Sequence, residues 1–262
     1  MRETVSAGEA ARRLGVAAAT IQRWVDKGLL HAERTPGGHR RIHVAELRRL
    51  IAANRTTELS GPLAEWLDVL FDGNALKTRI ALLTSRQRLG SWGETADEVA
   101  SALAEIGRCW EAGTCQVFQE HISSEALRRA AAVCASEMHP GAGAFCATLF
   151  SIEGERHTLG LSLAELVFAE SGWRSIWIGE GPPVDEFEVL VARHKPHLMA
   201  VSASAASRPG PIERYQSELI KIASSTGIPL ILGGSGAWKS LPGATRVASF
   251  KDLQAWLSGG QP

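Results

Sequence analysis

The sequence predicts a multidomain protein: a helix-turn-helix segment, then a four-helix bundle, then an α/β domain on a doubly wound parallel sheet. The chain has 262 residues, which is enough for two or three small domains. Helical periodicity with few breakers covers residues 63–138. After residue 144, apolar strand-like runs alternate with helical runs, the pattern of a Rossmann-like parallel sheet.

Charge is divided unevenly along the chain. Residues 1–55 hold eleven Lys or Arg and five Asp or Glu, a net charge of +6, whereas the remainder holds seventeen basic and twenty-three acidic residues, a net charge of −6. The basic N-terminal segment, residues 1–55, is called the head below. Because the rest of the chain is acidic, this distribution predicts that only the head binds a polyanion such as DNA. The hydrophobic share of 45% and the charged share of 21% are typical of a globular protein that buries a core.

Several features argue for a cytoplasmic protein with no membrane partner. Arg2 and Glu3 are not followed by an apolar run, so no signal peptide is expected. No stretch approaches eighteen apolar residues, and the run near Leu163 is broken by Glu165. The cysteines show no C-x-x-C spacing, which favours thiols over disulfides or a zinc site: Cys109, Cys115, Cys134 and Cys146.

The basic head predicts three helices, over residues 3–14, 18–28 and 44–54. Ser6 is the expected N-cap of the first helix, with Glu9 three residues later as its capping-box partner. A turn at Gly15-Val16 separates the first two helices, and Gly28 ends the second. Helix, short turn and helix is the arrangement that places a second helix in a major groove.

Polar and basic residues of this head are candidates for DNA contacts. A sharp turn over Thr35–Gly38 leads into three consecutive donors that can straddle phosphates. Early positions of the second helix can reach base edges or phosphates. Trp24 is expected in the core. Arg12 and Arg13 are compatible either with exposure to solvent or with contacts to DNA. The candidate DNA-binding residues are Thr20, Gln22, Arg23, Lys27, His39, Arg40 and Arg41.

Residues 3–50 resemble the winged helix-turn-helix domain of the MerR family. The resemblance rests on Ser6–Ala11, Ile21–Trp24, Lys27–Leu30 and Thr35–Arg41. It implies a double-stranded DNA operator as partner. Because one such domain reads few base pairs, we expect the chain to bind DNA as a homo-oligomer, either a dimer or a tetramer.

The segment after the head predicts a bundle between two linkers. Arg55–Pro62 is a polar linker, and His139–Gly143 is a second linker rich in Pro and Gly. Between them, breaks near Gly73, Gly90–Gly93 and Gly113 divide the helical pattern into about four helices. Gly113-Thr114 is typical of a helix end followed by an N-cap, so Trp110 would end one helix and Glu120-His121 would open the next.

The last third of the chain alternates strands with helices. The expected strands are 144–150, 175–178, 198–202 and 230–232, and the expected helices are 161–171, 184–193, 212–224 and 250–257. Ligands of such folds bind at the carboxyl ends of the strands. The loop Glu155–Gly160 follows the first strand and carries a histidine suited to a metal, while Ser202-Ala203-Ser204 and Gly233–Gly236 follow later strands.

Glu155, His157 and Gly160 resemble the cobalamin-binding signature of the methionine-synthase-like domain, with Glu in place of the more usual Asp. The resemblance implies that His157 coordinates cobalt from below, as the lower axial ligand. Glu155 would hold the far ring nitrogen and raise the basicity of the imidazole. Gly160 and four later residues would lie along the nucleotide tail of cobalamin: Ser202, Ser204, Gly233 and Gly234.

Trp110, followed by nine residues and then Glu120-His121, is similar to the bundle of CarH-like photoreceptors, light-responsive MerR-type repressors that use adenosylcobalamin. In that family these residues cover the upper face of the cofactor and pack on its adenosyl group. Residue 111 is a histidine in light-sensing members and binds cobalt after illumination. Here it is Glu111, a harder and weaker partner for cobalt.

The sequence therefore predicts a non-enzymatic, cobalamin-dependent transcriptional regulator, a repressor in which light acts on adenosylcobalamin to control oligomerisation and operator binding. Expected domains are 1–55 for DNA, 62–139 for the cobalamin cap and 143–260 for cobalamin binding. Two alternatives stay open: a light-independent sensor of cobalamin or another tetrapyrrole, which Glu111 favours, and a corrinoid carrier of the methyltransferase type, which the DNA-binding head disfavours.

Overall fold

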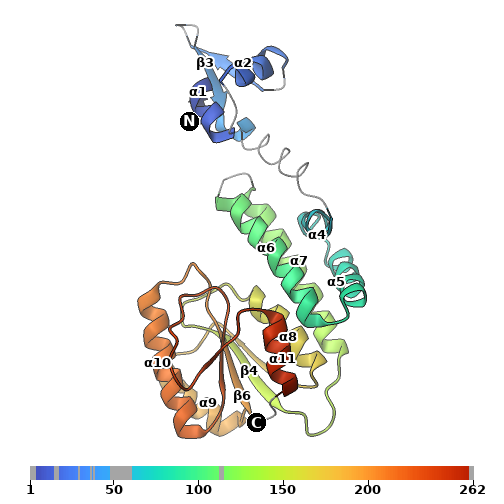
Figure 1. Cartoon of the computed structure of the whole chain (residues 1–262), viewed down its shortest axis with the longest axis vertical. Helices are drawn as coiled ribbons and strands as arrows, with labels where there is room; N and C mark the ends of the chain where they lie inside the picture. Colours follow the sequence, from blue (N-terminus) through green and yellow to red (C-terminus); the bar gives the residue numbers. More distant parts are fainter. Residues whose placement is uncertain are drawn as a thin grey trace.

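The computed structural model describes residues 4–14, 18–28, 30–35, 37, 39–47, 61–111 and 115–259. Its N-terminal part combines two helices, α1 (Ala7–Leu14) and α2 (Ala18–Asp26), with a small antiparallel sheet (Figure 1). The sheet has the order β1-β3-β2, built from β1 (Thr4–Ser6), β2 (Ala32–Arg34) and β3 (Arg40–His43). This arrangement agrees with the expected winged helix-turn-helix.

The first helix begins later than the sequence predicted. Residues 4–6 form β1 instead, because Val5 pairs with Ile42 of β3 and buries its side chain. Ser6 then acts as the predicted cap, since its Oγ accepts a hydrogen bond of 3.2 Å from the backbone N–H of Glu9. The turn at residues 15–16 and most of the expected helix 44–54 lie outside the described residues.

Four helices follow, as expected: α4 (Pro62–Phe71), α5 (Ala75–Leu89), α6 (Trp92–Glu111) and α7 (Val117–Glu137). Their ends have local causes. Asn74 caps α5 by accepting hydrogen bonds from the N–H groups of Leu76 and Lys77. Gly90 ends α5 in the left-handed conformation, at φ 88°.

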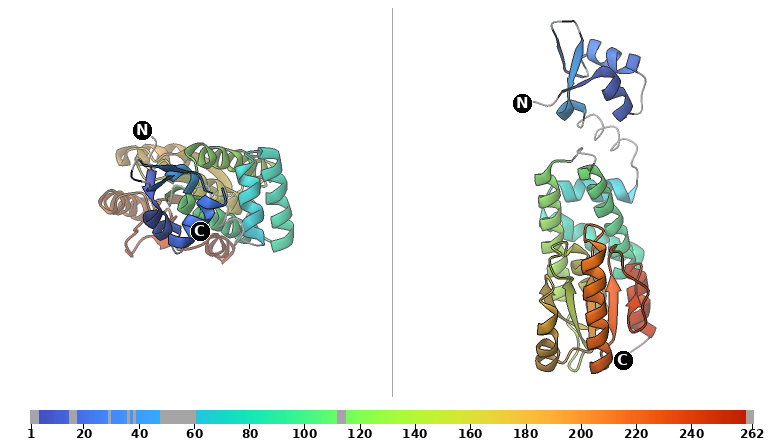
Figure 2. Two further views of the ribbon diagram at one scale, coloured as in Figure 1. Left: turned by 90° about the horizontal axis from the view of Figure 1, so that it is seen from above. Right: turned by 90° about the vertical axis from the view of Figure 1, so that its left-hand side faces the viewer.

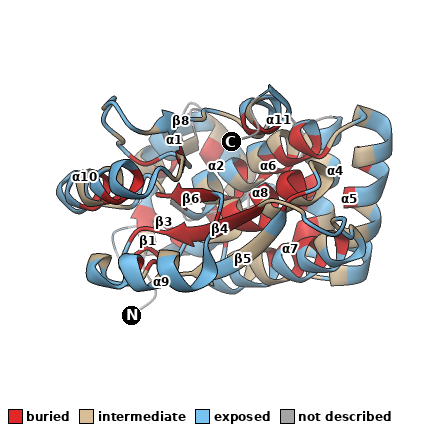
Figure 3. Cartoon of the chain, turned by 90° about the horizontal axis from the view of Figure 1, so that it is seen from below, coloured by how far each residue is buried: buried red, intermediate tan, exposed pale blue. Residues whose placement is uncertain are grey.

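The last part of the chain is a five-stranded parallel sheet of order β5-β4-β6-β7-β8. Its strands are β4 (Cys146–Ser151), β5 (Arg174–Gly179), β6 (Leu198–Ser202), β7 (Leu230–Gly233) and β8 (Thr245–Arg246). The two-residue strand β8 was not predicted, because its exposed residues show no apolar run. Figure 3 shows β4 and β6 buried along their length, as expected for central strands.

Helices cover both faces of this sheet. α8 (Leu159–Glu170) and α11 (Phe250–Gly259) contribute to one apolar core, while α9 (Phe187–His194), preceded by the short 3-10 helix η1 (Val184–Glu186), and α10 (Pro209–Thr226) contribute to the other. The first core also contains bundle residues, among them Trp66, Leu82 and Leu127. The bundle and the sheet domain therefore share one hydrophobic core. Figure 2 shows the bundle helices directly adjoining the sheet domain.

Polar contacts reinforce this shared core. The carboxylate of Glu170 in α8 accepts hydrogen bonds from Arg86 Nε (2.6 Å), from the N–H of Trp92 (2.8 Å) and from Gln254 Nε2 (2.9 Å). Asp97 of α6 accepts from the first N–H groups of α11. These contacts fasten the start of α6 to the end of α8, which determines where the far end of α6 lies.

The described helices include none that combines the length and apolar character required to cross a lipid bilayer.

Candidate functional site

The carboxyl ends of β4 and β6 form the topological switch point of the sheet. β4 connects through α8 to β5 on one side, and β6 pairs with its other side. In doubly wound sheets the crevice outside such a point binds ligands. The loops after the two strands meet there, since the N–H of Ile152 donates to the carbonyl of Ser202 at 3.0 Å.

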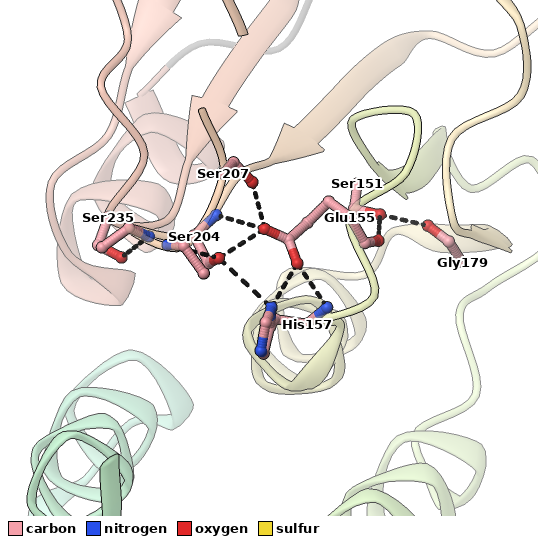
Figure 4. A network of polar contacts seen from close by, with 9 residues as sticks. Ser151, Glu155, His157, Gly179, Ser204, Ser207 and Ser235 are labelled. Atoms are coloured by element: carbon pink, nitrogen blue, oxygen red, sulfur yellow. Dashed lines mark hydrogen bonds and ion pairs between the residues drawn. The ribbon is translucent and has the colours of Figure 1, made fainter. Parts of the chain in front are cut away.

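Glu155 and His157 form a hydrogen-bonded pair in the loop after β4. Nδ1 of His157 lies 2.5 Å from Oε1 of Glu155, and the N–H of His157 donates to the same oxygen at 2.8 Å. The other oxygen, Oε2, accepts from the N–H and the hydroxyl of Ser204 and from the hydroxyl of Ser207 (Figure 4). Loops from two strands thus hold one carboxylate.

This carboxylate is ionised despite its burial. Burial by itself would raise the pKa of Glu155, but hydrogen bonds from Ser204, Ser207 and His157 outweigh it and lower the pKa to about 2. An ionised carboxylate only accepts hydrogen bonds. In the neutral imidazole, Nδ1 therefore carries the proton, and Nε2 keeps its lone pair.

The imidazole of His157 is presented to solvent. Its side chain is 69% exposed, whereas the side chain of Glu155 is only 4% exposed. Within the described part of the chain, no hydrogen bond engages Nε2. A fixed, exposed imidazole nitrogen backed by a carboxylate is the arrangement found in metal-ligating histidines. A single protein imidazole is sufficient for a metal whose other ligands are supplied by a macrocycle.

One of the predicted glycines, Gly234, lets backbone pack closely beside this pair. A Cβ on Gly160 would lie 3.9 Å from Ser202 Oγ, which is an ordinary contact distance. A Cβ on Gly234 would lie 2.3 Å from the carbonyl oxygen of Ala203, and Gly234 has a φ of 77°. Gly233 at the end of β7 is less constrained, because its nearest neighbour would be 3.8 Å away. The structure thus brings the predicted residues of the three loops to one edge of the sheet.

Two polar residues of this network were not predicted. Ser207 donates to Glu155, and Ser235 Oγ accepts a hydrogen bond of 2.9 Å from the N–H of Ala205. The signal for Ser207 was the serine spacing itself, since Ser204 and Ser207 follow closely after Ser202, the last residue of β6. The connection of the β6 and β7 loops through Ser235 depends on strand order, which the sequence does not state.

The predicted upper residues lie at the junction of α6 and α7. Trp110, 51% exposed, lies in the last turn of α6, which ends at Glu111. In α7, Glu120 Oε2 lies 2.7 Å from Nδ1 of His121, and Glu120 Oε1 accepts from Ser124 Oγ at 2.7 Å. The structure gives no hydrogen bond between Trp110 and this pair among the described residues.

Helix lengths place this junction relative to His157. α6 starts beside Glu170 at the end of α8 and packs along α8 in the opposite direction. α6 has 20 residues and α8 has 12. At about 1.5 Å per residue, α6 extends roughly 12 Å beyond the start of α8, where His157 lies. Figure 1 shows α6 and α7 projecting past the sheet domain.

Several predicted DNA-binding residues also come together. A hollow of about 540 Å³ in the N-terminal part is lined by Gln22 of α2 and by His39, Arg40 and Arg41 of the hairpin. Arg40 forms an ion pair with Asp26 at 2.5 Å, which joins hairpin and helix. Thr20 and Arg23 contact each other on α2, and Lys27 is exposed just after its end; none of the three lines the hollow.

Comparisons with known families match two regions of the chain. Residues 6–42 match the family described as MerR family regulatory protein. Residues 64–135, which span most of the four bundle helices, match the family described as B12 binding domain.

Two known proteins are similar over larger parts of the chain. The HTH-type transcriptional repressor CarH of Myxococcus xanthus is 27% identical over 266 residues, covering 87% of this chain and 88% of that protein. A monomethylamine corrinoid protein of Methanosarcina barkeri is similar in structure, with a TM-score of 0.55 and 18% identity, covering 74% of this chain and 96% of the other. The second likeness shows the fold, and the first confirms the resemblance to CarH-like MerR-type regulators.

Proposed function

We propose that this CarH-like chain, with its MerR-type head and B12-binding region, is a cytoplasmic, cobalamin-dependent repressor of transcription without enzymatic activity. The observation that carries the proposal is the Glu155–His157 pair at the switch point of the sheet. Its buried carboxylate fixes one ring nitrogen and leaves the other exposed. An imidazole held in this way is oriented to serve as an axial ligand of cobalt.

The residues present fit such a cofactor. His157 would hold cobalt from below through Nε2, and Gly160, Ser202, Ser204, Gly233 and Gly234 would line its nucleotide tail. Trp110, Glu111, Glu120 and His121 would cover the opposite face, since α6 and α7 extend past His157. When bound, adenosylcobalamin would supply a cobalt–carbon bond that light can break. The protein would supply the cover that keeps water from that face.

In this proposal residues 1–55 bind double-stranded DNA, residues 62–139 form the cap and residues 143–260 hold cobalamin. Thr20, Gln22, Arg23, Lys27, His39, Arg40 and Arg41 would contact the operator, with phosphates supplying most of the affinity. The chain would act as a homo-oligomer, because paired heads double the length of DNA that is read.

Switching requires that the cofactor distinguish two states of the protein. A ligand shifts an equilibrium only through its different affinity for the two states. The adenosyl group would contact Trp110 and stabilise the oligomer that binds DNA, and its loss in light would favour a weaker-binding state. Glu111 favours the light-independent alternative, in which the protein senses the abundance of cobalamin or of another tetrapyrrole.

A corrinoid carrier of the methyltransferase type is the remaining alternative, and the fold shared with a corrinoid protein supports it. The MerR-type match over residues 6–42 disfavours it. Deleting residues 1–55 separates the two, because a carrier would still serve its partner enzyme whereas a regulator would lose its operator.

The deciding experiment is an absorption spectrum of the purified protein with adenosylcobalamin in the dark and after green light, with size-exclusion chromatography of both samples. A bound, base-off spectrum that changes with light, together with a change in size, supports the photoreceptor. A bound spectrum without a change in assembly supports the light-independent sensor. Absence of binding contradicts the cobalamin proposal.

A further inference from the structure

Two cysteines are joined by a backbone hydrogen bond at the connection between α6 and α7. Cys109 lies in the last turn of α6, and Cys115 lies just before α7, which begins at Val117. The N–H of Cys115 donates a hydrogen bond of 3.2 Å to the carbonyl of Cys109. Both residues carry thiols in this structure, and both belong to the described part of the chain.

This hydrogen bond determines how far apart the two Cα atoms lie. Residues joined by an N–H···O=C bond have Cα atoms about 5.5 Å apart in an antiparallel sheet and about 6 Å apart along an α-helix. A disulfide requires Cα atoms roughly 4.4–6.8 Å apart. The backbone of Cys109 and Cys115 therefore already has the spacing of a disulfide, so that rotation of the side chains is the main movement that the bond requires.

The two sulfur atoms also lie near each other. Burial raises the pKa of the Cys115 thiol, and the neighbouring Cys109 thiol raises it further. Sγ of Cys109 donates to Glu105 Oε1 at 3.6 Å, and Sγ of Cys115 donates to the carbonyl of Gln116 at 3.4 Å. Thiols are weak donors, so these two contacts oppose a rotation of the sulfur atoms only weakly.

The four cysteines differ in their access to solvent and in their surroundings. Cys109 is partly exposed, whereas Cys115 is buried, with 7% exposed. An oxidant can therefore reach Cys109, and Cys115 is positioned as the second thiol that completes a disulfide. Cys134 packs in the shared core, roughly 25 Å along α7 from its start, and Cys146 is fully buried in β4.

We propose that Cys109 and Cys115 form a redox-sensitive modification site, which converts reversibly between two thiols and an intramolecular disulfide. The oxidant is a low-molecular-weight disulfide such as glutathione disulfide. Cys109 loses its proton to solvent, and its sulfur attacks the oxidant, breaks the S–S bond and releases one glutathione thiolate. Cys115 then loses its proton, attacks the Cys109 sulfur of the mixed disulfide and releases the second thiolate.

Electrons and protons balance in this exchange. The protein gives up two electrons and two protons, and the two released thiolates take up the protons to become two glutathione molecules. The protein gains one S–S bond, and the oxidant loses one. An excess of glutathione drives the same steps in reverse and restores both thiols.

The disulfide would fasten the connection that carries the proposed cobalamin cap. Trp110 directly follows Cys109, and Glu120 lies in the first turn of α7. Because the backbone already has the spacing of a disulfide, the bond would hold these residues near their present places before a cofactor binds. Binding groups that are fixed beforehand lose less entropy on binding. This consequence rests on the proposed function, whereas the formation of the disulfide does not.

Mass spectrometry of the full-length protein tests the chemistry. Cleavage after arginine leaves Cys109 and Cys115 together in the peptide 109–128, and Cys134 and Cys146 together in the peptide 130–156. The protein would be equilibrated with defined ratios of oxidised to reduced glutathione, quenched with acid, alkylated and digested. We expect peptide 109–128 to lose the mass of two hydrogen atoms and to escape alkylation, while peptide 130–156 stays fully alkylated.

Two results would overturn the site. One is a peptide 109–128 that keeps both thiols at every ratio, and the other is one that accumulates a glutathione adduct without closing the disulfide. Cys115→Ser should give that adduct on Cys109, because the second thiol is missing. Cys109→Ser, at a partly exposed position, should leave Cys115 largely unmodified. A disulfide that involved Cys134 or Cys146 in either variant or in the wild type would contradict the assignment.

Absorbance titration with adenosylcobalamin in the dark tests the effect on the cap. The disulfide form should bind about two- to tenfold more tightly than the dithiol form, the range expected from fixing one or two groups beforehand. Cys115→Ser under the same oxidising conditions should show no such gain. Equal or weaker binding by the disulfide form would overturn the fastening of the cap. If neither form binds, the proposed function and the effect on the cap both fail, while the masses alone decide whether the disulfide exists.

Discussion

Nδ1 of His157 lies 2.5 Å from Oε1 of Glu155, and the second oxygen of that carboxylate is held by Ser204 and Ser207 from the neighbouring loop. The imidazole is therefore oriented by a group that is itself fixed on both sides. A ligand whose direction is fixed before binding loses little entropy when it coordinates a metal.

Replacing Glu155 by Gln should weaken cobalamin binding about 10- to 100-fold, the usual effect of removing such a partner of a metal-ligating histidine. The amide cannot accept from serine hydroxyls and the imidazole through both of its terminal atoms. Absorbance titration with cobalamin measures the loss. Glu153→Gln is the matched control, because Glu153 is an exposed carboxylate of the same loop. Equal affinities of wild type and Glu155→Gln would contradict the orienting role.

Acid should destabilise the protein partly through Glu155. Its pKa falls from an ordinary value of 4.5 to about 2 in the folded protein. A carboxyl with a lowered folded pKa contributes stability that is complete above the unfolded pKa and is lost as pH falls toward the folded pKa. The contribution, at most about 3 kcal/mol, should therefore disappear between about pH 5 and pH 2.

Urea denaturation across this pH range would measure the effect as a change in the free energy of unfolding. Glu155→Gln should show a smaller acid-dependent loss than wild type, because the amide does not titrate. An identical pH slope in both proteins would show that Glu155 does not contribute.

Gly234→Ala should displace the loop after β7 and abolish tight cobalamin binding. The new Cβ would lie 2.3 Å from the Ala203 carbonyl oxygen, in addition to the strain at φ 77°. Gly227→Ala is the matched control, because Gly227 has a φ of 72° and open space around its Cβ position. Both variants should lose about 1–2 kcal/mol from the left-handed backbone. Only Gly234→Ala should lose further stability, about 1–3 kcal/mol, from overpacking.

Chemical denaturation gives the stabilities of both variants, and cobalamin titration gives their affinities. If Gly227→Ala impaired binding as strongly as Gly234→Ala, backbone strain rather than close packing would be the cause.

Trp110→Ala should weaken the binding of adenosylcobalamin more than the binding of hydroxocobalamin, because the indole would pack on the adenosyl group. Trp110 is 51% exposed, so its removal should change stability little, within about 0.5 kcal/mol. Trp177→Ala offers a control at another exposed tryptophan, 39% exposed on β5. Paired titrations with the two cobalamins measure the difference, and an equal loss for both would argue against an adenosyl contact.

Arg41→Ala should weaken binding to operator DNA and lower the slope of log affinity against log salt by about 1, the effect of one lost phosphate contact. Arg41 lines the hollow shared with Gln22 and His39. Fluorescence anisotropy with operator fragments at several salt concentrations measures both quantities. Arg128→Ala is the control, since Arg128 is an exposed arginine that pairs with Glu125 on α7, outside the DNA-binding head. An unchanged salt slope for Arg41→Ala would show that Arg41 does not contact a DNA phosphate.

Much of the fold was predictable because its signals are local. Asn74, Gly90 and Gly28 terminate or start helices through their own backbone and side chains, so the breaks predicted near Gly28, Gly73 and Gly90 agree with the structure. The breaks predicted at Gly15-Val16 and at Gly113 lie outside the described residues. The strands β4, β6 and β7 are continuous apolar runs, because both of their faces are covered. β1 escaped prediction because it is defined by its pairing with β3, which is distant in the sequence, and β8 escaped because its two exposed residues show no apolar run.

The residues of the candidate site were likewise only partly predictable from the sequence. Glu155, His157 and Gly160 were recognisable from their spacing and from the strand before them, whereas the hydrogen bonds that Ser207 and Ser235 form were not. Their places depend on the strand order β4-β6-β7-β8, which brings together loops that are tens of residues apart.

The sequence by itself determined the order of the three parts, the helix boundaries set by caps and glycines, and the presence of a histidine with its carboxylate after the first strand of the sheet. Only the tertiary structure decided that bundle and sheet share one core, that α6 projects past His157, and that serines of a second loop hold Glu155. The physical reason is that propensity and capping act within a few residues, while burial and strand pairing join residues that the chain keeps far apart.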